Sequence, residues 1–470
     1  MQRVNPIKTV TRLLWRRATS TSDYWLTRFV LLRVLGFVYF FAFLSLATQV
    51  LPLIGENGLL PADNYLENVN SGFSTTADAF KTLPTIFWIN DSDAFLQSMA
   101  WVGVIISFVI MLGFANVPIM LFNWFLYMSF VHVGQLWYGY GWETQLLETG
   151  FLAMFLVPLL DARPFPKHPP PAPIIWLFRW LAFRINLGAG LIKVRTDACW
   201  KDLTCLFYHY ETQPIPNPLS PFFHALPEFI DRLGVATTHI VQIVMPFLIF
   251  TWRNSRTFAG VALLLFQILL IFTGNYSFLN WITIVPIIAL FDDKFLAKFL
   301  PKWIVKRASN AAKRSKPSNF GKVAVFVMVV TVIWLSIPVV LNLMASNQAM
   351  NTSFNQLHLV NTYGAFGSIT KVRHELVMQG TDELVLTEQT KWREYEFKAK
   401  PTNVSRQPVI IAPYQPRIDW QLWFAAFQRP EQNPWIPHLM WKLLHNDDGV
   451  LSLIEHNPFP DKPPEFIRIE

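Results

Sequence analysis

The stretch from Cys199 to Pro227 carries the residue types that could do chemistry. It reads CWKDLTCLFYHYETQPIPNPLSPFFHALP and holds both cysteines of the chain, two histidines and two acidic residues. These side chains could bind a metal, transfer protons or form a recognition surface. Cys199 and Cys205 stand six positions apart, whereas zinc sites use paired clusters of cysteine or histidine. We therefore predict no metal site, and a disulfide between the two cysteines stays open.

His209 and Glu211 are the residues of this stretch that are best suited to acid-base chemistry. They lie two positions apart and share a face only if the segment is extended. Prolines at positions 214, 216, 218 and 221 follow and impose a stiff, non-helical path. Such a path loses little entropy on binding, which favours either a rigid lid over a helical bundle or a docking surface.

The composition indicates the class of protein that positions these residues. The chain has 470 residues, of which 52% are hydrophobic and 15% charged. It is too apolar for a soluble enzyme and typical of a membrane protein with several spans. Because Lys and Arg gather on the cytoplasmic side of such proteins, the net charge of +8 does not indicate nucleic acid binding. The expected partners include the lipid bilayer and no nucleic acid.

Apolar stretches predict the membrane spans, because about 20 apolar residues cross a bilayer as a helix. They follow a basic segment, residues 1–28. The predicted fold class is a polytopic α-helical membrane bundle of about nine spans over residues 29–343. The spans are 29–50, 95–114, 117–136, 146–160, 174–194, 235–251, 258–273, 276–291 and 322–343.

The charges of the loops predict how the chain is oriented. Segment 1–28 is basic and loop 51–93 is acidic, while loop 292–321 carries eight Lys and Arg against two Asp. Basic loops stay in the cytoplasm. We therefore predict a cytoplasmic N-terminus, and an odd number of spans then places the 195–234 loop and residues 344–470 on the opposite side.

Residues 344–470 have the composition of a soluble domain. Apolar and polar residues alternate from Lys371 to Met378 and from Glu394 to Ala399, the pattern of half-buried strands. Aromatic residues then recur at helical spacing from Trp420 to Phe427, and a second helix is expected from Trp435 to His445. These patterns predict a small extracytoplasmic β-rich domain with flanking helices.

The segment APYQPRIDWQLWF within this domain is unusually rich in aromatic residues. One interpretation is that they close the core or dock the domain on the membrane. The other is a surface that binds a partner protein, where Trp, Tyr and Arg concentrate binding energy. The candidate binding residues are Tyr414, Arg417, Trp420 and Trp423.

Charged residues within the predicted spans cost free energy unless they pair with an opposite charge or are reached by water. Glu148 lies near the end of the fourth span, Arg184 near the middle of the fifth and Lys193 at its end. We predict that these three form an intramembrane polar network, in a neighbourhood shared with Glu143, His209 and Glu211. The network either fixes the register of the helices or forms a binding or acid-base site.

Several blocks of the sequence resemble the lipase maturation factor family. The most distinctive is GLIKVRTDACWKDLTCLFYHYETQPIPNPLSPFFHALP. Others are YGYGWETQLLETGFLAMFL, GNYSFLNWITIVPIIALFDD, YGAFGSITKVRHELVMQGTDE, WREYEFKAKP and APYQPRIDWQLWFAA. The matches follow in order over nearly the whole chain.

This resemblance implies a membrane-embedded folding factor that helps secreted proteins, lipases above all, to reach an active state. The C-terminal domain of the family is associated with binding of the client, and the 195–234 loop is expected on the same side. In animals the family resides in the endoplasmic reticulum. The compact chain, its two cysteines and its EFIRIE end lead us to favour a bacterial inner membrane.

A second resemblance supplies an alternative of another class. The block GLIK…W…YH is similar to the equivalent region of vitamin K-dependent gamma-carboxylases, which implies an acid-base site of Lys193, His209 and Glu211 at the membrane boundary. A desolvated lysine can act as a base. The chain has no Gly-rich phosphate loop, His-Glu-x-x-His or Gly-x-Ser-x-Gly motif, which argues only against well-known soluble chemistries. Because quinone chemistry needs more than one matched lysine, we predict no cofactor and favour a factor without catalysis.

Overall fold

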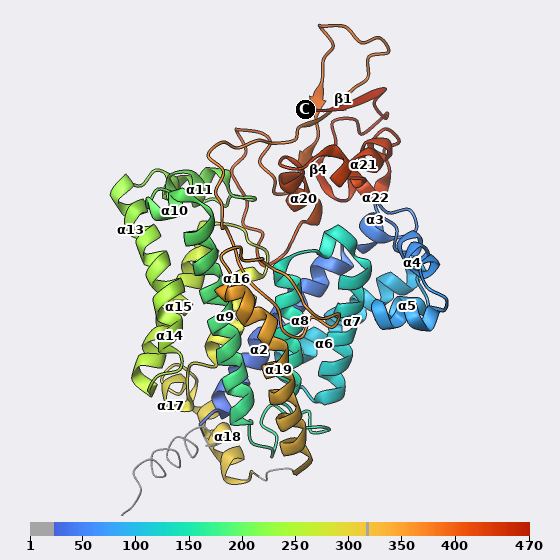
Figure 1. The fold of residues 1–470 in the computed structure, drawn as a ribbon. Helices are drawn as coiled ribbons and strands as arrows, with labels where there is room; N and C mark the ends of the chain where they lie inside the picture. Colours follow the sequence, from blue (N-terminus) through green and yellow to red (C-terminus); the bar gives the residue numbers. More distant parts are fainter. Residues whose placement is uncertain (1–22, 316–318) are drawn as a thin grey trace, which may run out of the picture.

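The computed structural model describes residues 23–315 and 319–470 and consists of a helical bundle with a C-terminal region above it (Figure 1). Most of the predicted basic segment 1–28 lies outside the described residues. We call the end of the bundle beneath residues 345–470 the domain end, and the opposite end, which carries α17 and α18, the basic end. The residues from 345 to 470 are called the C-terminal region.

Five helices of the described chain are long and apolar enough to cross a membrane. They are α2 (Trp25–Ala47), α6 (Asp93–Leu112), α9 (Ala172–Thr196), α15 (Arg253–Thr273) and α19 (Asn319–Met344). Helix α2 packs against α6 and α16, and most of its residues are buried. The length of these helices follows from their apolar composition, since each has about the 20 residues that cross a bilayer or slightly more.

Shorter helices fill the remaining predicted spans. They are α7 (Val117–Val133), α8 (Gly141–Met154), α13 (Glu228–His239), the π-helix η3 (Ile240–Val244), α14 (Met245–Leu248) and α16 (Leu279–Ile288). Helices α13, η3 and α14 follow one another without a break, and α16 contains Pro286. The nine predicted spans thus all coincide with helical segments, but only five of them have the length and hydropathy of a span, so a count of nine is not confirmed.

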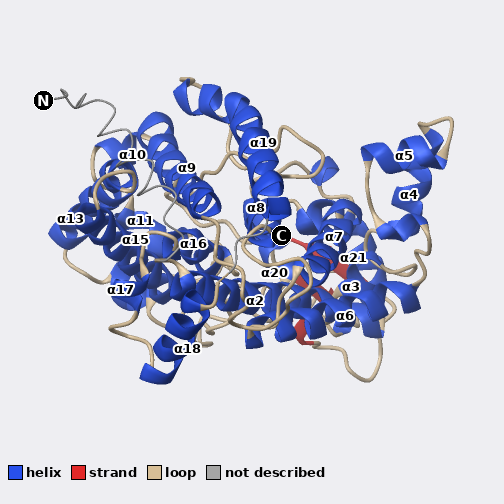
Figure 2. Ribbon diagram, turned by 90° about the horizontal axis from the view of Figure 1, so that it is seen from below, coloured by secondary structure: helices blue, strands red, loops and turns tan. Residues whose placement is uncertain are grey.

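Short helices lie at both ends of the bundle. At the domain end these are α3 (Val50–Ile54), α4 (Ala62–Ser71), α5 (Thr76–Thr82), α10 (Ala198–Lys201), α11 (Leu206–Thr212) and α12 (Ser220–His224). At the basic end these are α17 (Asp293–Leu296) and α18 (Lys302–Lys313). Helices α4 and α5 project from the side of the bundle opposite to α13 (Figure 2).

The C-terminal region contains few strands. They are β1 (Met378–Thr381), β2 (Arg393–Glu394), β3 (Glu396–Phe397), β4 (Ile454–His456) and β5 (Phe466–Ile469). They form a three-stranded sheet in the order β2-β1-β5 and a separate pair β3-β4, all antiparallel. The helices are α20 (Arg417–Ala425), α21 (Trp435–Leu443) and α22 (Asp448–Leu451).

The prediction of a β-rich domain was therefore wrong in extent. The alternation from Glu394 to Ala399 does bury Tyr395, Phe397 and Ala399. The segment before Met378 is not a strand, because Arg373 ties it elsewhere: its guanidinium donates to the carbonyl oxygens of residues 211, 213 and 214. These hydrogen bonds from Arg373 take the place of the backbone pairing that a strand would make.

Thiol labelling tests the predicted orientation of the bundle. In intact cells of a bacterial host that carries the chain in its inner membrane, a cysteine at Ser315, at the basic end, should resist a membrane-impermeant thiol reagent, whereas one at Thr387, exposed in the C-terminal region, should react. The native cysteines form a disulfide and give no background. Permeabilised cells provide the control, since both positions should then react. The reverse pattern in intact cells would contradict a cytoplasmic N-terminus.

Candidate functional site

Buried charges gather where α8 and α9 meet the C-terminal region. Glu143 and Glu148 lie five positions apart on α8, and each carboxylate pairs with an arginine from another part of the chain. We call these two pairs the junction pairs. All four side chains are at most 1% exposed, so the pairs must compensate the cost of desolvation by their mutual geometry.

The first junction pair joins Glu148 to Arg184 on α9. The second oxygen of Glu148 accepts hydrogen bonds from the Tyr363 hydroxyl at 2.6 Å and from the Asn361 backbone N–H at 3.0 Å. Arg184 also donates to the Asn361 carbonyl at 2.7 Å. The pair thereby holds the segment that follows α19 inside the bundle.

The second junction pair joins Glu143 to Arg417 at the start of α20, at 2.7 Å. The other oxygen of Glu143 accepts the hydroxyl proton of Tyr127. Arg417 also donates to the Trp137 carbonyl at 2.6 Å, and its guanidinium stacks 3.7 Å from the Tyr138 ring. This pair docks the C-terminal region on the bundle.

Helix α20 is held from its other side by Asp419. The carboxylate accepts the backbone N–H of Ala399 at 2.6 Å and of Lys400 at 2.8 Å. Burial raises the pKa of Asp419 to about 6. Contacts to both the bundle and the strands therefore fix the position of α20.

Lys193 does not join the pair of Glu148 and Arg184, which corrects the predicted network of three. Its ammonium donates to the carbonyl oxygens of Ala189 at 3.2 Å and Ala365 at 2.7 Å. Lys193 follows Arg184 by nine positions on one helix, which places it about 14 Å further along the axis and on the opposite face. The two basic side chains therefore contact different partners.

His209 and Glu211 also point apart. They lie on the short helix α11, where two positions correspond to nearly opposite faces. His209 is buried and its Nε2 lies 2.9 Å from the Tyr276 hydroxyl, whereas Glu211 is half exposed and lies 3.5 Å from His224. Burial, with the nearby ammonium of Lys193, lowers the pKa of His209 to about 4. The three residues of the enzyme alternative therefore do not converge on one reacting position.

The two cysteines form a disulfide directly after α9. Both are buried, in a cluster with Trp200, Val235 and Ile369. Asp197 accepts the backbone N–H of Cys199 and of Ile369, which links this loop to the C-terminal region. Asp197 lies close to both sulfur atoms. These atoms are bonded to each other, so they are not free to coordinate a metal.

The proline segment after α11 is a packed element rather than a free docking surface. Residues 212–217 are all buried. Gln213 donates to Ser220 at 2.8 Å and to the Thr273 carbonyl at 3.1 Å, and it accepts from the Tyr276 hydroxyl at 2.6 Å. Of the two interpretations of this segment, the geometry favours the rigid lid.

Two of the predicted binding residues on α20 cannot reach a partner. Arg417 and Trp420 are 0% and 3% exposed, since the bundle covers this face of the helix. Trp423 is partly exposed but donates its indole N–H to the Thr212 carbonyl at 3.2 Å. Tyr414 is partly exposed and its hydroxyl lies 2.7 Å from that of Thr48. All four residues thus serve the docking of the C-terminal region.

The sequence placed Glu148 and Arg184 in one network but did not pair Glu143 with Arg417. Glu143 was noted only as a neighbour of Glu148, and Asn361 and Tyr363 were not singled out. The signal that could have found them is the pair of glutamates on one apolar helix, because each needs a basic partner. Which arginine becomes that partner depends on contacts between residues as many as 274 positions apart in the sequence.

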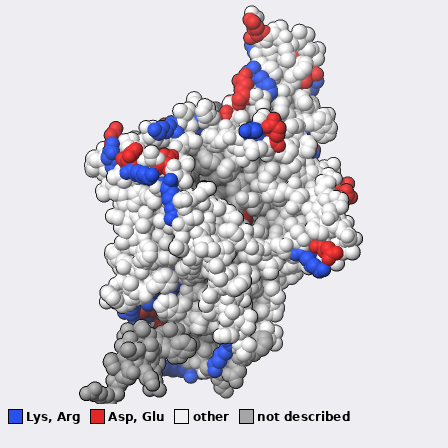
Figure 3. Space-filling view, in the orientation of Figure 1, with Lys and Arg blue, Asp and Glu red and all other residues white. Residues whose placement is uncertain are grey.

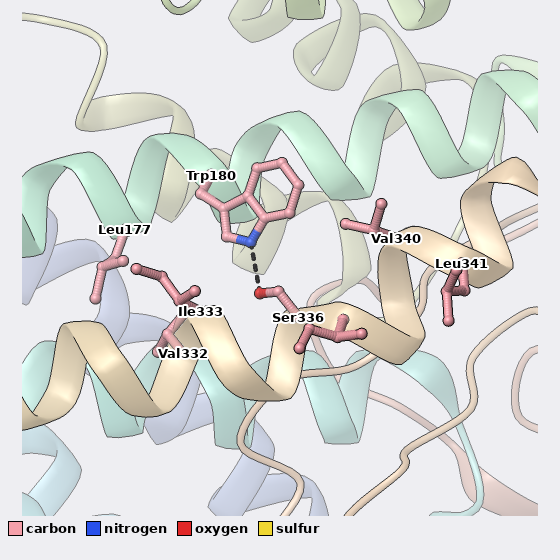
Figure 4. Close-up of a pocket in the computed structure, with 8 residues that line it drawn as sticks. Leu177, Trp180, Val332, Ile333, Ser336, Val340 and Leu341 are labelled. Carbon is pink, nitrogen blue, oxygen red and sulfur yellow. Dashed lines mark hydrogen bonds between the residues drawn. The ribbon is translucent and has the colours of Figure 1, made fainter.

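A cavity of about 430 Å³ lies between α9 and α19 (Figure 4). Its lining is apolar apart from Ser336, whose hydroxyl accepts the indole N–H of Trp180 at 2.9 Å. No residue of its lining is ionisable. The cavity therefore offers the chemistry of a hydrocarbon environment and adds nothing to the enzyme alternative.

The charges on the surface agree with a bilayer around the bundle. On the face shown in Figure 3, charged side chains gather towards the two ends and at the edge that carries α4 and α5, and they leave a wide uncharged area between them. Many large apolar side chains of the bundle helices are exposed, for example on α15 and α19. An aqueous solvent would disfavour such a surface, whereas lipid chains would not.

Comparisons with known proteins agree with both parts of the fold. The family model described as the lipase maturation factor transmembrane domain matches residues 26–298, and that of the lipase maturation factor C-terminal domain matches residues 359–470. No solved structure matches this chain.

Curated relatives match over nearly the whole chain. Lipase maturation factor 1 of Mus musculus is 48% identical over 472 residues, covering 96% of this chain and 82% of the relative. The protein of that name from Homo sapiens is 48% identical and covers 94% and 82%. Lipase maturation factor 2 of Xenopus laevis is 29% identical and covers 95% and 78%.

These relatives are vertebrate proteins, so they give no support to the expected bacterial inner membrane. The apolar helices and the matched transmembrane domain together show an integral membrane protein with several spans. Because the family models cover more than half of the chain, it belongs to the lipase maturation factor family.

Proposed function

We propose that this protein is a membrane-embedded maturation factor that helps secreted lipases to fold. Family membership supports the lipase client, since the relatives carry lipase maturation in their names. The proposed role is binding rather than catalysis, because Lys193, His209 and Glu211 contact different partners and do not converge on one position.

The observation that carries this proposal is the apolar tip of the hairpin between β1 and β2. We define the apolar tip as Leu384, Val385 and Leu386, which are 75%, 73% and 49% exposed. The hairpin projects from the C-terminal region away from the bundle (Figure 1). Three consecutive exposed apolar residues are unfavourable in water unless a partner covers them.

Hydrogen bonds and an ion pair hold the base of the hairpin, so the apolar tip has a defined position. Strand β1 pairs with both β2 and β5, and Asp382 bonds Arg393 at 2.8 Å across the hairpin. Glu383 accepts the backbone N–H of Lys391 at 2.9 Å. We propose that the apolar tip binds apolar segments that an incompletely folded client leaves exposed.

The disulfide supports an oxidising compartment for this side of the molecule. The proposed orientation places the N-terminus in the cytoplasm and both the C-terminal region and the 195–234 loop outside it. In an animal cell the site would face the lumen of the endoplasmic reticulum, where secreted lipases fold. The rigid loop and the docked α20 then serve as the platform that carries the apolar tip.

The test replaces Leu384 and Val385 by serine. In cells without their own lipase maturation factor, this double variant should lower the specific activity of a co-expressed secreted lipase. Loss of an apolar anchor costs binding about tenfold or more. The measurement is lipase activity per unit of lipase protein in the medium, with co-precipitation of lipase and factor from the membrane fraction.

The matched control replaces Val404 and Ile410 by serine, because both are exposed apolar residues of the same region outside the hairpin. It should retain activity and co-precipitation. Equal loss in both variants, or no loss in either, would contradict binding by the apolar tip. If the wild-type protein does not raise lipase activity, the proposed function itself is wrong.

A further inference from the structure

Helix α18 and the turn before it carry a concentration of basic residues at the basic end of the bundle. Residues 294–315 contain seven basic side chains and no acidic one: Lys294, Lys298, Lys302, Lys306, Arg307, Lys313 and Arg314. All seven are exposed. None of them forms an ion pair with a residue that the structure describes. This charge is therefore available to a partner.

The exposed face of α18 is organised in two rows. One row contains Lys302, Lys306, Ser309 and Lys313, and the adjacent row contains Trp303, Arg307, Asn310 and Arg314. The spacing of three and four positions keeps each row on one side of the helix. The basic side chains thus form one continuous stripe.

The opposite face fixes α18 to the bundle. Ile304 and Ala308 are buried in a cluster with Trp25, Leu26 and Phe29 at the start of α2. Because α2 is long and apolar enough to cross a membrane, an α2 that spans it would begin at the boundary of the membrane. The stripe is consequently held at the level where lipid headgroups lie.

Aromatic side chains accompany the stripe. Phe299 and Trp303 are 72% and 58% exposed, and the guanidinium of Arg307 lies 5.3 Å from the Trp303 ring. Aromatic residues of this kind anchor proteins at the interface between hydrocarbon and water. Together with the basic stripe they have the composition of a helix that lies in the plane of a membrane surface.

Acidic residues near α18 are engaged elsewhere. Asp292 pairs with Arg253, and Asp161 pairs with Arg163. Asp293 accepts the backbone N–H groups at the start of α2. Among the described residues, the carboxylates of Asp161, Asp292 and Asp293 are thus engaged away from the stripe.

We propose that α18 is an interfacial helix that binds the headgroups of anionic phospholipids in the adjoining leaflet. Its Lys and Arg side chains contact the phosphate and carboxylate groups, while Phe299 and Trp303 enter the headgroup region. This role concerns how the bundle is seated in its membrane and does not depend on the proposed client.

The test uses the full chain in nanodiscs, with a polarity-sensitive fluorophore on a cysteine introduced at Ser309. Both native cysteines are in the disulfide, so the label has one site. Both leaflets of a nanodisc have the same lipids, so the orientation of the chain does not matter. The emission should shift to shorter wavelength as phosphatidylserine replaces phosphatidylcholine, and the shift should shrink at high salt.

The variant replaces Lys302, Lys306 and Lys313 by glutamine. Each basic residue near an anionic surface strengthens binding roughly fivefold, so α18 of the triple variant should bind anionic headgroups about 100-fold more weakly. The emission of this variant should then respond little to phosphatidylserine. The matched control replaces Lys201 at the domain end and Lys371 and Lys391 in the C-terminal region by glutamine. All three are exposed, and this variant should respond like the wild type.

Two outcomes would overturn the proposal. One is an emission that does not depend on the phosphatidylserine content, whether or not an acidic soluble protein binds the helix. The other is an equal loss of the response in the variant and in the control. Unchanged thermal stability of both triple variants shows that the response reports binding and not folding.

Discussion

Replacing Arg184 by methionine should lower the free energy of unfolding by about 3 to 5 kcal/mol, because it leaves the carboxylate of Glu148 buried without its cation. Tyr363 and Asn361 still donate to Glu148, but neutral donors compensate a buried charge only in part. The measurement is the fraction of folded protein that survives heating in nanodiscs. Secretion of active lipase should fall in proportion to the loss of folded factor.

Two further variants separate the effect of the unpaired charge from the effect of the smaller side chain. Glu148→Gln combined with Arg184→Met removes both charges and should be more stable than Arg184→Met alone. Arg232→Met is the matched control, since Arg232 is exposed and should tolerate the same change. If the double variant is no more stable than Arg184→Met alone, the pair does not stabilise the bundle as we describe.

Replacing Arg417 by methionine should release the C-terminal region from the bundle. The variant loses the ion pair to Glu143 and the bond to the Trp137 carbonyl, and it leaves a buried carboxylate facing an apolar side chain. A loss of about 3 kcal/mol corresponds to roughly 100-fold more frequent opening. Limited digestion with chymotrypsin measures this opening through cleavage within residues 415–422, because these residues are all buried while the region is docked.

Arg429→Met serves as the control, because Arg429 lies in the same region but is exposed. Its rate of proteolysis should match that of the wild type. Combining Glu143→Gln with Arg417→Met should slow the cleavage again, since no unpaired charge then remains. Identical rates for Arg417→Met and Arg429→Met would show that the second junction pair does not dock the region.

Both predictions concern α8, which makes this helix the mechanical link of the molecule. Glu148 holds the segment after α19, and Glu143 holds α20. The proposed client site depends on this link, because the apolar tip projects from the part of the chain that the junction pairs position. A released C-terminal region should therefore lose client binding even though the apolar tip is intact.

The sequence by itself determined the class of protein and the position of most helices. Runs of apolar residues are local features, and a bilayer requires them to be helical whatever surrounds them. The same reasoning found Glu148 and Arg184, because charges in apolar helices are rare. With only two cysteines in the chain, no other internal disulfide could form.

Only the tertiary structure decided which side chains meet and which surface is free. The aromatic residues of α20 and the apolar tip are equally hydrophobic in the sequence, yet Trp420 is buried under α8 while Leu384 is exposed. Helical spacing shows that a stripe needs a partner, but the bundle and a client protein satisfy it equally well. The choice depends on packing between segments hundreds of residues apart, which no local pattern records.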